Sequence, residues 1–162
     1  MAEPGLLEQR GDRMTVDFRI RKAPSYRVAS QRWKGPWSES RIHAEFRKVQ
    51  AWAKAQGLRT GVWVFREPAE RTWEVMVEVR GSARTSGPYR LRKVAASRVA
   101  SVVFDPNVVA PRVVYHGISD WLRWRRKDGT IHRIGSYREV YSGDPWTNPK
   151  AWARTEIQVE VR

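Results

Sequence analysis

The residues with the clearest potential for chemistry lie at positions 136–141, which read Ser-Tyr-Arg-Glu-Val-Tyr. Apolar and polar side chains alternate there with the period of two that is typical of a strand. The alternation places Tyr137, Glu139 and Tyr141 on one face. A carboxylate sheltered between aromatic rings is costly to leave unpaired, and it suits a cationic ligand or a proton-transfer step. A surface strand with a solvated glutamate is the alternative interpretation.

The composition limits the class of protein. The 162 residues include 31 Lys and Arg against 17 Asp and Glu, a net charge of +14 that favours anionic neighbours such as nucleic acid. The absence of cysteine excludes disulfides, thiolate catalysis and cysteine zinc sites. His43, His116 and His132 lack metal-ligand spacing, and no P-loop, Rossmann or G-x-S-x-G pattern occurs. We therefore expect no metal and no cofactor.

No stretch is long and apolar enough to resemble a membrane span or a secretory signal. The sequence therefore predicts a soluble, cytoplasmic protein without membrane contact, either a monomer or a homodimer. Nine tryptophans are more than one small core needs, so some are expected to line a cavity or an interface.

The helices and strands that must position these residues are predicted from the periodicity of apolar side chains and from the residues that cap or end each element. Residues 1–13 show no clear period and are expected to form a flexible leader before a single domain, 14–162. One helix is capped by Ser38 or Ser40 and ends at Gly57, and a second runs from 111 to 127. Strands are predicted at 15–22, 26–33, 61–67, 72–80, 88–93, 97–104, 131–141 and 155–161. Strands 15–22 and 26–33 are expected to form a hairpin-like unit, and 88–93 and 97–104 another strand pair.

The second half of the chain repeats the first. The matches are Arg27-Val28-Ala29-Ser30 with Arg98-Val99-Ala100-Ser101, Phe65-Arg66-Glu67 with Tyr137-Arg138-Glu139, and Glu74 to Arg80 with Glu156 to Arg162. Three matches in one order predict a duplication, with repeats 14–80 and 88–162. The expected fold is α+β, with two antiparallel sheet-and-helix halves related by a pseudo-twofold axis. By the repeat, Glu67 is predicted to be the counterpart of Glu139.

The seam between two such halves is a natural place for a groove. Trp63, Phe65 and Glu67 share a face of their strand, and we expect that face to point into the groove together with Glu139. Trp37 and Trp146 are further candidates for the groove wall. Ordinary core packing is the alternative for each aromatic residue, and a strand-end surface charge is the alternative for Glu67.

A series of short motifs follows the predicted elements in order: Ala23-Pro24 with Val28-Ala29, Gly35-Pro36-Trp37, Trp121-Leu122, Arg138-Glu139-Val140-Tyr141 with Asp144-Pro145, and Thr155-Glu156-Ile157. With these motifs the sequence resembles the GyrI-like small-molecule-binding domain, which is also the effector-binding domain of multidrug-sensing transcription activators. The resemblance covers roughly residues 15–162. Asp105-Pro106-Asn107 departs from the Gly-Pro-aromatic sequence that is usual in the family.

The resemblance implies a stand-alone member in which Glu139 faces an aromatic pocket and meets lipophilic, often cationic ligands. Some members of the family are hydrolases that open cyclopropane rings in DNA-alkylating compounds, and others modulate DNA gyrase. The first hypothesis is therefore a binding protein for lipophilic aromatic molecules. In the second, Glu139 is catalytic, as a general base on water or an acid toward a leaving group.

A third hypothesis is a basic protein that contacts DNA or gyrase. The run Arg123-Trp124-Arg125-Arg126-Lys127 places an aromatic ring among cations, an arrangement that can grip phosphates and stack on a base. A solvated end of the second helix is the alternative, because cations favour helix C-termini.

Overall fold

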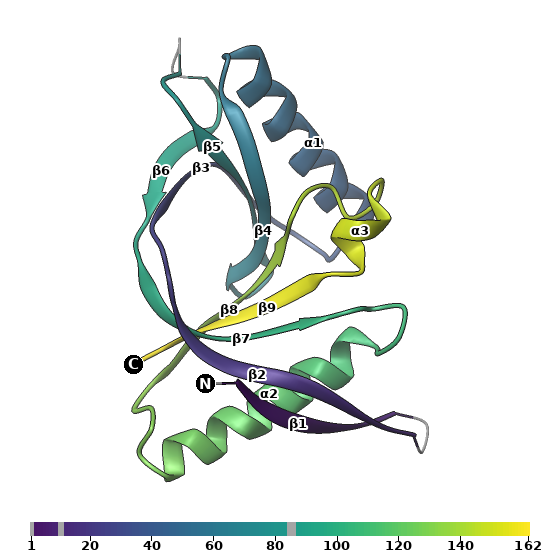
Figure 1. Ribbon diagram of the computed structural model, residues 1–162. Helices are drawn as coiled ribbons and strands as arrows, with labels where there is room; N and C mark the ends of the chain where they lie inside the picture. The colour runs from purple at the N-terminus through teal and green to yellow at the C-terminus, as the bar shows by residue number, and fades with distance from the viewer. Residues whose placement is uncertain (1, 10–11, 84–86) are drawn as a thin grey trace.

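The computed structural model describes residues 2–9, 12–83 and 87–162. It shows an α+β fold in which helices cover one face of a curved antiparallel sheet (Figure 1). The strands are β1 (Ala2–Gln9), β2 (Asp12–Ala23), β3 (Tyr26–Lys34), β4 (Arg59–Ala69), β5 (Thr72–Arg80), β6 (Arg90–Val94), β7 (Ser97–Phe104), β8 (Ile134–Tyr141) and β9 (Thr155–Val161). The helices are α1 (Glu39–Ala55), α2 (Pro111–Lys127) and the short α3 (Pro149–Trp152). The last of these lies between β8 and β9, outside the helices and strands that the sequence predicted.

The strands follow the order β1-β2-β7-β9-β8-β4-β5-β3-β6 within the described residues. Apart from β1, this order reads as two equivalent sets of four strands that meet where β8 pairs with β4. One half of the sheet is β6-β3-β5-β4 with α1, and the other is β8-β9-β7-β2 with α2 and β1 (Figure 1). The predicted fold class is therefore confirmed.

The predicted pairing of adjacent strands is wrong. Only Pro24 and Ser25 separate β2 from β3, yet β2 pairs with β1 and β7, while β3 pairs with β5 and β6. Likewise β6 belongs to the first half of the sheet, and β7, two residues later, to the second. Each of these connections carries the chain across the molecule instead of turning it back (Figure 1). The halves of the sheet are therefore not the sequence halves 14–80 and 88–162.

Residues 2–9 belong to the segment that the sequence predicted as a flexible leader. They form β1, which pairs antiparallel with β2. The side chain of Leu7 is 3% exposed, and a Cβ atom added at Gly117 of α2 would lie 2.4 Å from its Cδ2. The glycine inside α2 thus permits a close approach between helix and strand, in exchange for weaker helix propensity. Residues 1, 10 and 11 of the predicted leader, and residues 84–86 between the two predicted repeats, lie outside the described residues.

The helices form where the apolar period predicted them. Ile42, Phe46, Val49 and Ala53 of α1 are buried, and the hydroxyl of Ser38 caps this helix by accepting the N–H of Arg41 at 3.2 Å. The buried residues of α2 are Val114, Ile118 and Leu122. Each helix packs on its own half of the sheet, so two cores lie side by side on the helix-bearing face. The seam between the cores passes between α1 and α2.

The strand registers define the repeat more closely than the sequence does. Ser30 pairs with Met76 in the first half, and Ser101 pairs with Gln158 in the second, as the repeat requires. Met76 pairs onward with Val64, and Gln158 with Arg138. Val64 is therefore equivalent to Arg138, and the next residues, Phe65 and Glu139, are equivalent too. The prediction that Glu67 is the counterpart of Glu139 is therefore wrong by two residues, because Phe65 occupies that position.

Candidate functional site

Glu139 lies on β8 at the seam, directly opposite Phe65 of β4. Its carboxylate is held from both sides. The hydroxyl of Tyr115, on α2, donates to Oε1 at 2.6 Å, and the hydroxyl of Tyr141, two residues along β8, donates to Oε2 at 2.5 Å. A charged acceptor strengthens such bonds and fixes the orientation of the carboxylate.

Burial and charge act together on the two tyrosines. Burial raises the pKa of both hydroxyls above the ordinary value of 10.0, and the charge of Glu139 together with the hydrogen bonds it accepts raises them further. Tyr115 and Tyr141 therefore stay protonated, and both remain donors to the carboxylate at neutral pH. Each carboxylate oxygen retains further acceptor capacity for a ligand.

Two adjoining clefts open onto this carboxylate and share Trp37, Phe65 and Glu139. One has a volume of about 250 Å³ and extends under α1 toward Trp146 and Trp152. The other, of about 600 Å³, is lined further by Tyr115, Tyr137 and Glu67. The seam thus contains two clefts that have aromatic walls and share one carboxylate.

Aromatic side chains from distant segments form the walls. Trp37 is 61% exposed and stands edge-on to Phe65 and Trp73, with ring centroids 5.8 and 5.5 Å apart. Trp146 stacks on His43 at 4.5 Å, and its indole N–H donates to Glu39 at 3.1 Å. A large ring left open to solvent beside a cleft can close on a planar ligand with little reorganisation.

The structure separates the residues that the sequence grouped. Tyr137 lines the larger cleft, and its hydroxyl lies 2.9 Å from that of Ser119. Glu67 lies exposed at the rim, where its carboxylate accepts the backbone N–H of Arg71 at 3.2 Å. Trp63, predicted in the wall, lines neither cleft. It is fully buried beneath α1 and stacks on Phe46 with ring centroids 4.7 Å apart.

Sequence reasoning missed several residues of the site. Tyr115 was not singled out, although it follows the buried Val114 in the first turns of α2 and so points beside the apolar stripe. The pair of His43 and Asp144, 3.2 Å apart beneath Trp146, was also missed. Burial alone would raise the pKa of Asp144, but the hydrogen bonds from His43 and from the backbone of Trp146 lower it. Such long-range pairs leave no local sequence signal.

The basic run at the end of α2 lies away from both clefts. Arg125 pairs with Glu3 and with Asp128, and its guanidinium lies over the ring of Trp121 at 5.4 Å. Arg123 pairs with Asp120, whereas Arg126 and Lys127 are exposed. Among the residues that the structure describes, no group of three or more His, Cys, Asp or Glu side chains is arranged to hold a metal ion.

Comparison with known proteins agrees with this fold. The family model of the GyrI-like small molecule binding domain matches residues 17–162, and the chain belongs to that family. No curated protein matches the sequence significantly. Within the described residues, no helix is both long and apolar enough to cross a membrane.

Three solved structures illustrate the likeness. The C-terminal domain of EcmrR has a TM-score of 0.67 at 19% identity, covering 92% of this chain and 99% of that one. A hydrolase from Listeria innocua has a TM-score of 0.58 at 9% identity, covering 90% and 91%. SAV2435 bound to tetraphenylphosphonium has a TM-score of 0.50 at 13% identity, covering 90% and 93%. At these identities the likeness concerns the fold alone.

Proposed function

We propose that this protein binds lipophilic aromatic molecules in the clefts at the seam, with Glu139 as the anchoring charge. The observation that carries the proposal is the position of one carboxylate, held by Tyr115 and Tyr141, between two clefts with aromatic walls. Aromatic faces supply contact area, and a fixed charge supplies orientation.

The ligand class that fits best carries a positive charge. No arginine or lysine of the described chain forms an ion pair with Glu139, so its charge is balanced only by neutral hydroxyl donors. A cation in the cleft would meet this carboxylate and the π-faces of the surrounding rings. The net charge of +14 opposes cations at long range, but at physiological ionic strength salt largely screens that repulsion between charges more than about 8 Å apart.

Tetraphenylphosphonium is a suitable probe because it is a lipophilic aromatic cation, and triphenylphosphine oxide is a neutral molecule of related shape. Trp37 and Trp146 line the clefts, so quenching of tryptophan fluorescence should report binding. We expect saturable quenching by the cation. Glu139→Gln should weaken cation binding by roughly tenfold, the equivalent of about 1.4 kcal/mol, and should change binding of the neutral molecule little.

Glu67→Gln is the matched control, because it removes the same charge from the rim of the larger cleft. It should bind both probes almost as the wild type does. If Glu139→Gln binds the cation as tightly as the wild type does, or if Glu67→Gln loses as much affinity, then Glu139 is not the anchor.

Hydrolysis in the same clefts is a second candidate, because the carboxylate of Glu139 is fixed in orientation at the point where both clefts meet. A carboxylate positioned in this way can take a proton from water. The test is incubation with a cyclopropane-containing alkylating compound, followed by mass spectrometry of the products. A ring-opened product with the wild type, absent with folded Glu139→Ala, would support hydrolysis. Saturable probe binding without any product would support the binding function and contradict hydrolysis.

A further inference from the structure

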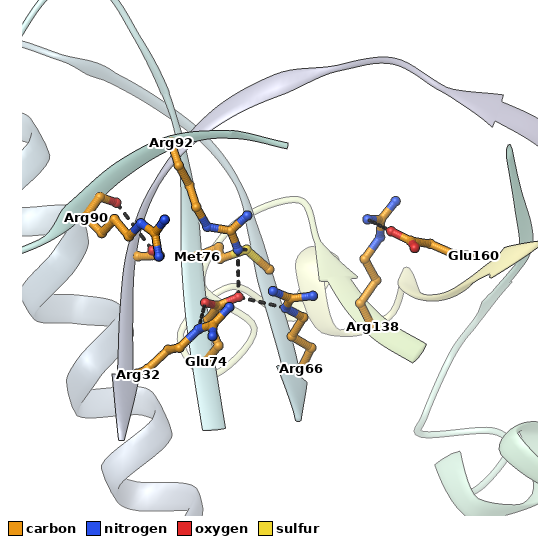
Figure 2. Close-up of polar contacts among 9 residues, drawn as sticks. Arg32, Arg66, Glu74, Met76, Arg90, Arg92, Arg138 and Glu160 are labelled. Carbon is orange, nitrogen blue, oxygen red and sulfur yellow. Dashed lines mark hydrogen bonds and ion pairs between the residues drawn. The ribbon is translucent and has the colours of Figure 1, made fainter. Parts of the chain in front are cut away.

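A row of polar side chains crosses the face of the sheet that carries no helices. Because strand side chains alternate, the neighbours of the site residues point to this opposite face. Arg32 of β3 faces Glu74 of β5 in the ladder, Glu74 faces Arg66 of β4, and Arg138 of β8 faces Gln158 of β9. Figure 2 shows the glutamate and the three arginines of this row, with Arg92 of β6 reaching into the same group.

Glu74 is the centre of the group and is 1% exposed. Its Oε1 accepts from Arg66 at 2.7 Å and from Arg92 at 2.8 Å, and its Oε2 accepts from Arg32 (Figure 2). Three guanidinium groups around one carboxylate leave an excess of two positive charges. This excess lies in a partly buried position, where charges are screened less than at the surface.

Arg138 adds a fourth cation beside this group. It is 6% exposed, and its Nε donates to the neutral Gln158 at 2.8 Å, while Glu160 lies 3.6 Å from Nη1. Its Nη2 is buried and has no hydrogen-bond partner among the residues described, and the same is true of Nε of Arg92. Buried donors of this kind normally have acceptors. Arg66 follows Phe65 on β4 and Arg138 precedes Glu139 on β8, and Phe65 and Glu139 are partners in the ladder, so these two cationic residues lie on neighbouring strands.

The other half of the sheet has a glutamate at the position equivalent to Glu74, and it shows how many arginines such a glutamate needs in this fold. Glu156, the counterpart of Glu74, has one ion pair within the described residues, with Arg21 at 2.6 Å, and it also accepts the neutral amide of Gln158 at 3.1 Å. By the registers, Val103 and Val140 occupy the positions of Arg32 and Arg66. The fold therefore tolerates apolar residues at these positions, and the additional arginines of the first half need another explanation.

We propose that Arg66, Arg92 and Arg138 form a binding site for a tetrahedral oxyanion, phosphate or sulfate, on the helix-free face. Guanidinium groups present paired N–H donors that match the oxygens of such anions. Access is open on that face, because the side chains of Arg66 and Arg92 are each 22% exposed. The proposal does not depend on a ligand at Glu139.

The test is titration calorimetry of the whole chain with sodium phosphate against sodium chloride of equal ionic strength. The wild type should show saturable heat with phosphate. Arg138→Gln and Arg92→Gln should each weaken phosphate binding by roughly tenfold. Arg80→Gln is the matched control, since it removes the same charge at an exposed ion pair with Glu78, and it should bind phosphate like the wild type. An acetate arm reports whether planar carboxylates are also accepted.

Two results would overturn the proposal: no saturable heat with the wild type, or Arg92→Gln binding phosphate as tightly as Arg80→Gln does. Arg92 lies on the edge strand β6, so this variant keeps the test decisive if Arg138→Gln does not fold. Glu139→Gln should bind phosphate like the wild type. Failure at the aromatic site and failure at the arginine site are therefore distinguishable.

Discussion

The two halves of the sheet share a plan but differ where they meet and on the face opposite the helices. At the seam, the second half supplies Glu139 where the first supplies Phe65. On the opposite face, the first half gathers three arginines around Glu74, whereas in the second Glu156 has one ion pair within the described residues, with Arg21. The two halves thus share the arrangement of strands and helices, and both proposed binding sites lie at positions where the halves differ in sequence.

The largest expected difference between the halves concerns these two glutamates. Glu74→Gln removes the partner of three guanidinium groups at a position that is 1% exposed, and should lower the free energy of unfolding by about 3–5 kcal/mol. Glu156→Gln breaks one pair whose arginine side chain is 39% exposed, and should cost less than about 1 kcal/mol. Urea unfolding of both variants measures the difference. Equal losses would mean that the arginine group is energetically no different from its counterpart.

The hydroxyls around Glu139 make a second contrast, because both come from the second half. The pKa values of Tyr115 and Tyr141 lie above 10.0 in the folded protein. Their contribution to stability is therefore complete below pH 10 and is lost as the pH rises, since the unfolded chain releases these protons first. Each group should add about 1.4 kcal/mol of lost stability per pH unit above pH 10.

Urea unfolding between pH 9 and pH 11 measures this slope. The double variant Tyr115→Phe and Tyr141→Phe should show a shallower loss than the wild type. Tyr89, a partly buried tyrosine of the first half that packs on Trp52, provides the control Tyr89→Phe. A slope unchanged in the double variant would show that the two hydroxyls ionise as easily in the folded chain as in the unfolded one.

The helix N-termini give the smallest contrast. Ser38 caps α1, so Ser38→Ala should cost about 1 kcal/mol. Ala110 precedes α2 without a side-chain cap, although Gln9 of β1 accepts its backbone N–H at 2.6 Å. Ala110→Ser should therefore stabilise the protein by up to about 1 kcal/mol. Thermal unfolding of both variants checks the opposite signs, and a loss in Ala110→Ser would show that Gln9 already completes this helix end.

Much of the fold could be predicted because it rests on local pattern. The stripe of Ile42, Phe46 and Val49 predicted α1, and the alternation around Glu139 predicted both β8 and the face on which its carboxylate lies. The wall of the site was predicted less well, because periodicity states only that a tryptophan is on an apolar face. Trp37 stands open beside the clefts and Trp63 is sealed under α1, and the packing of α1 decides between them.

By itself, the sequence determined the elements, their buried faces and the existence of a duplication, since side-chain period and turn residues are properties of the local chain. Only the tertiary structure decided which strands pair, that Phe65 opposes Glu139, and that Tyr115 reaches the same carboxylate. The physical reason is that every strand offers the same backbone donors and acceptors, so its partner is selected by packing across the whole sheet.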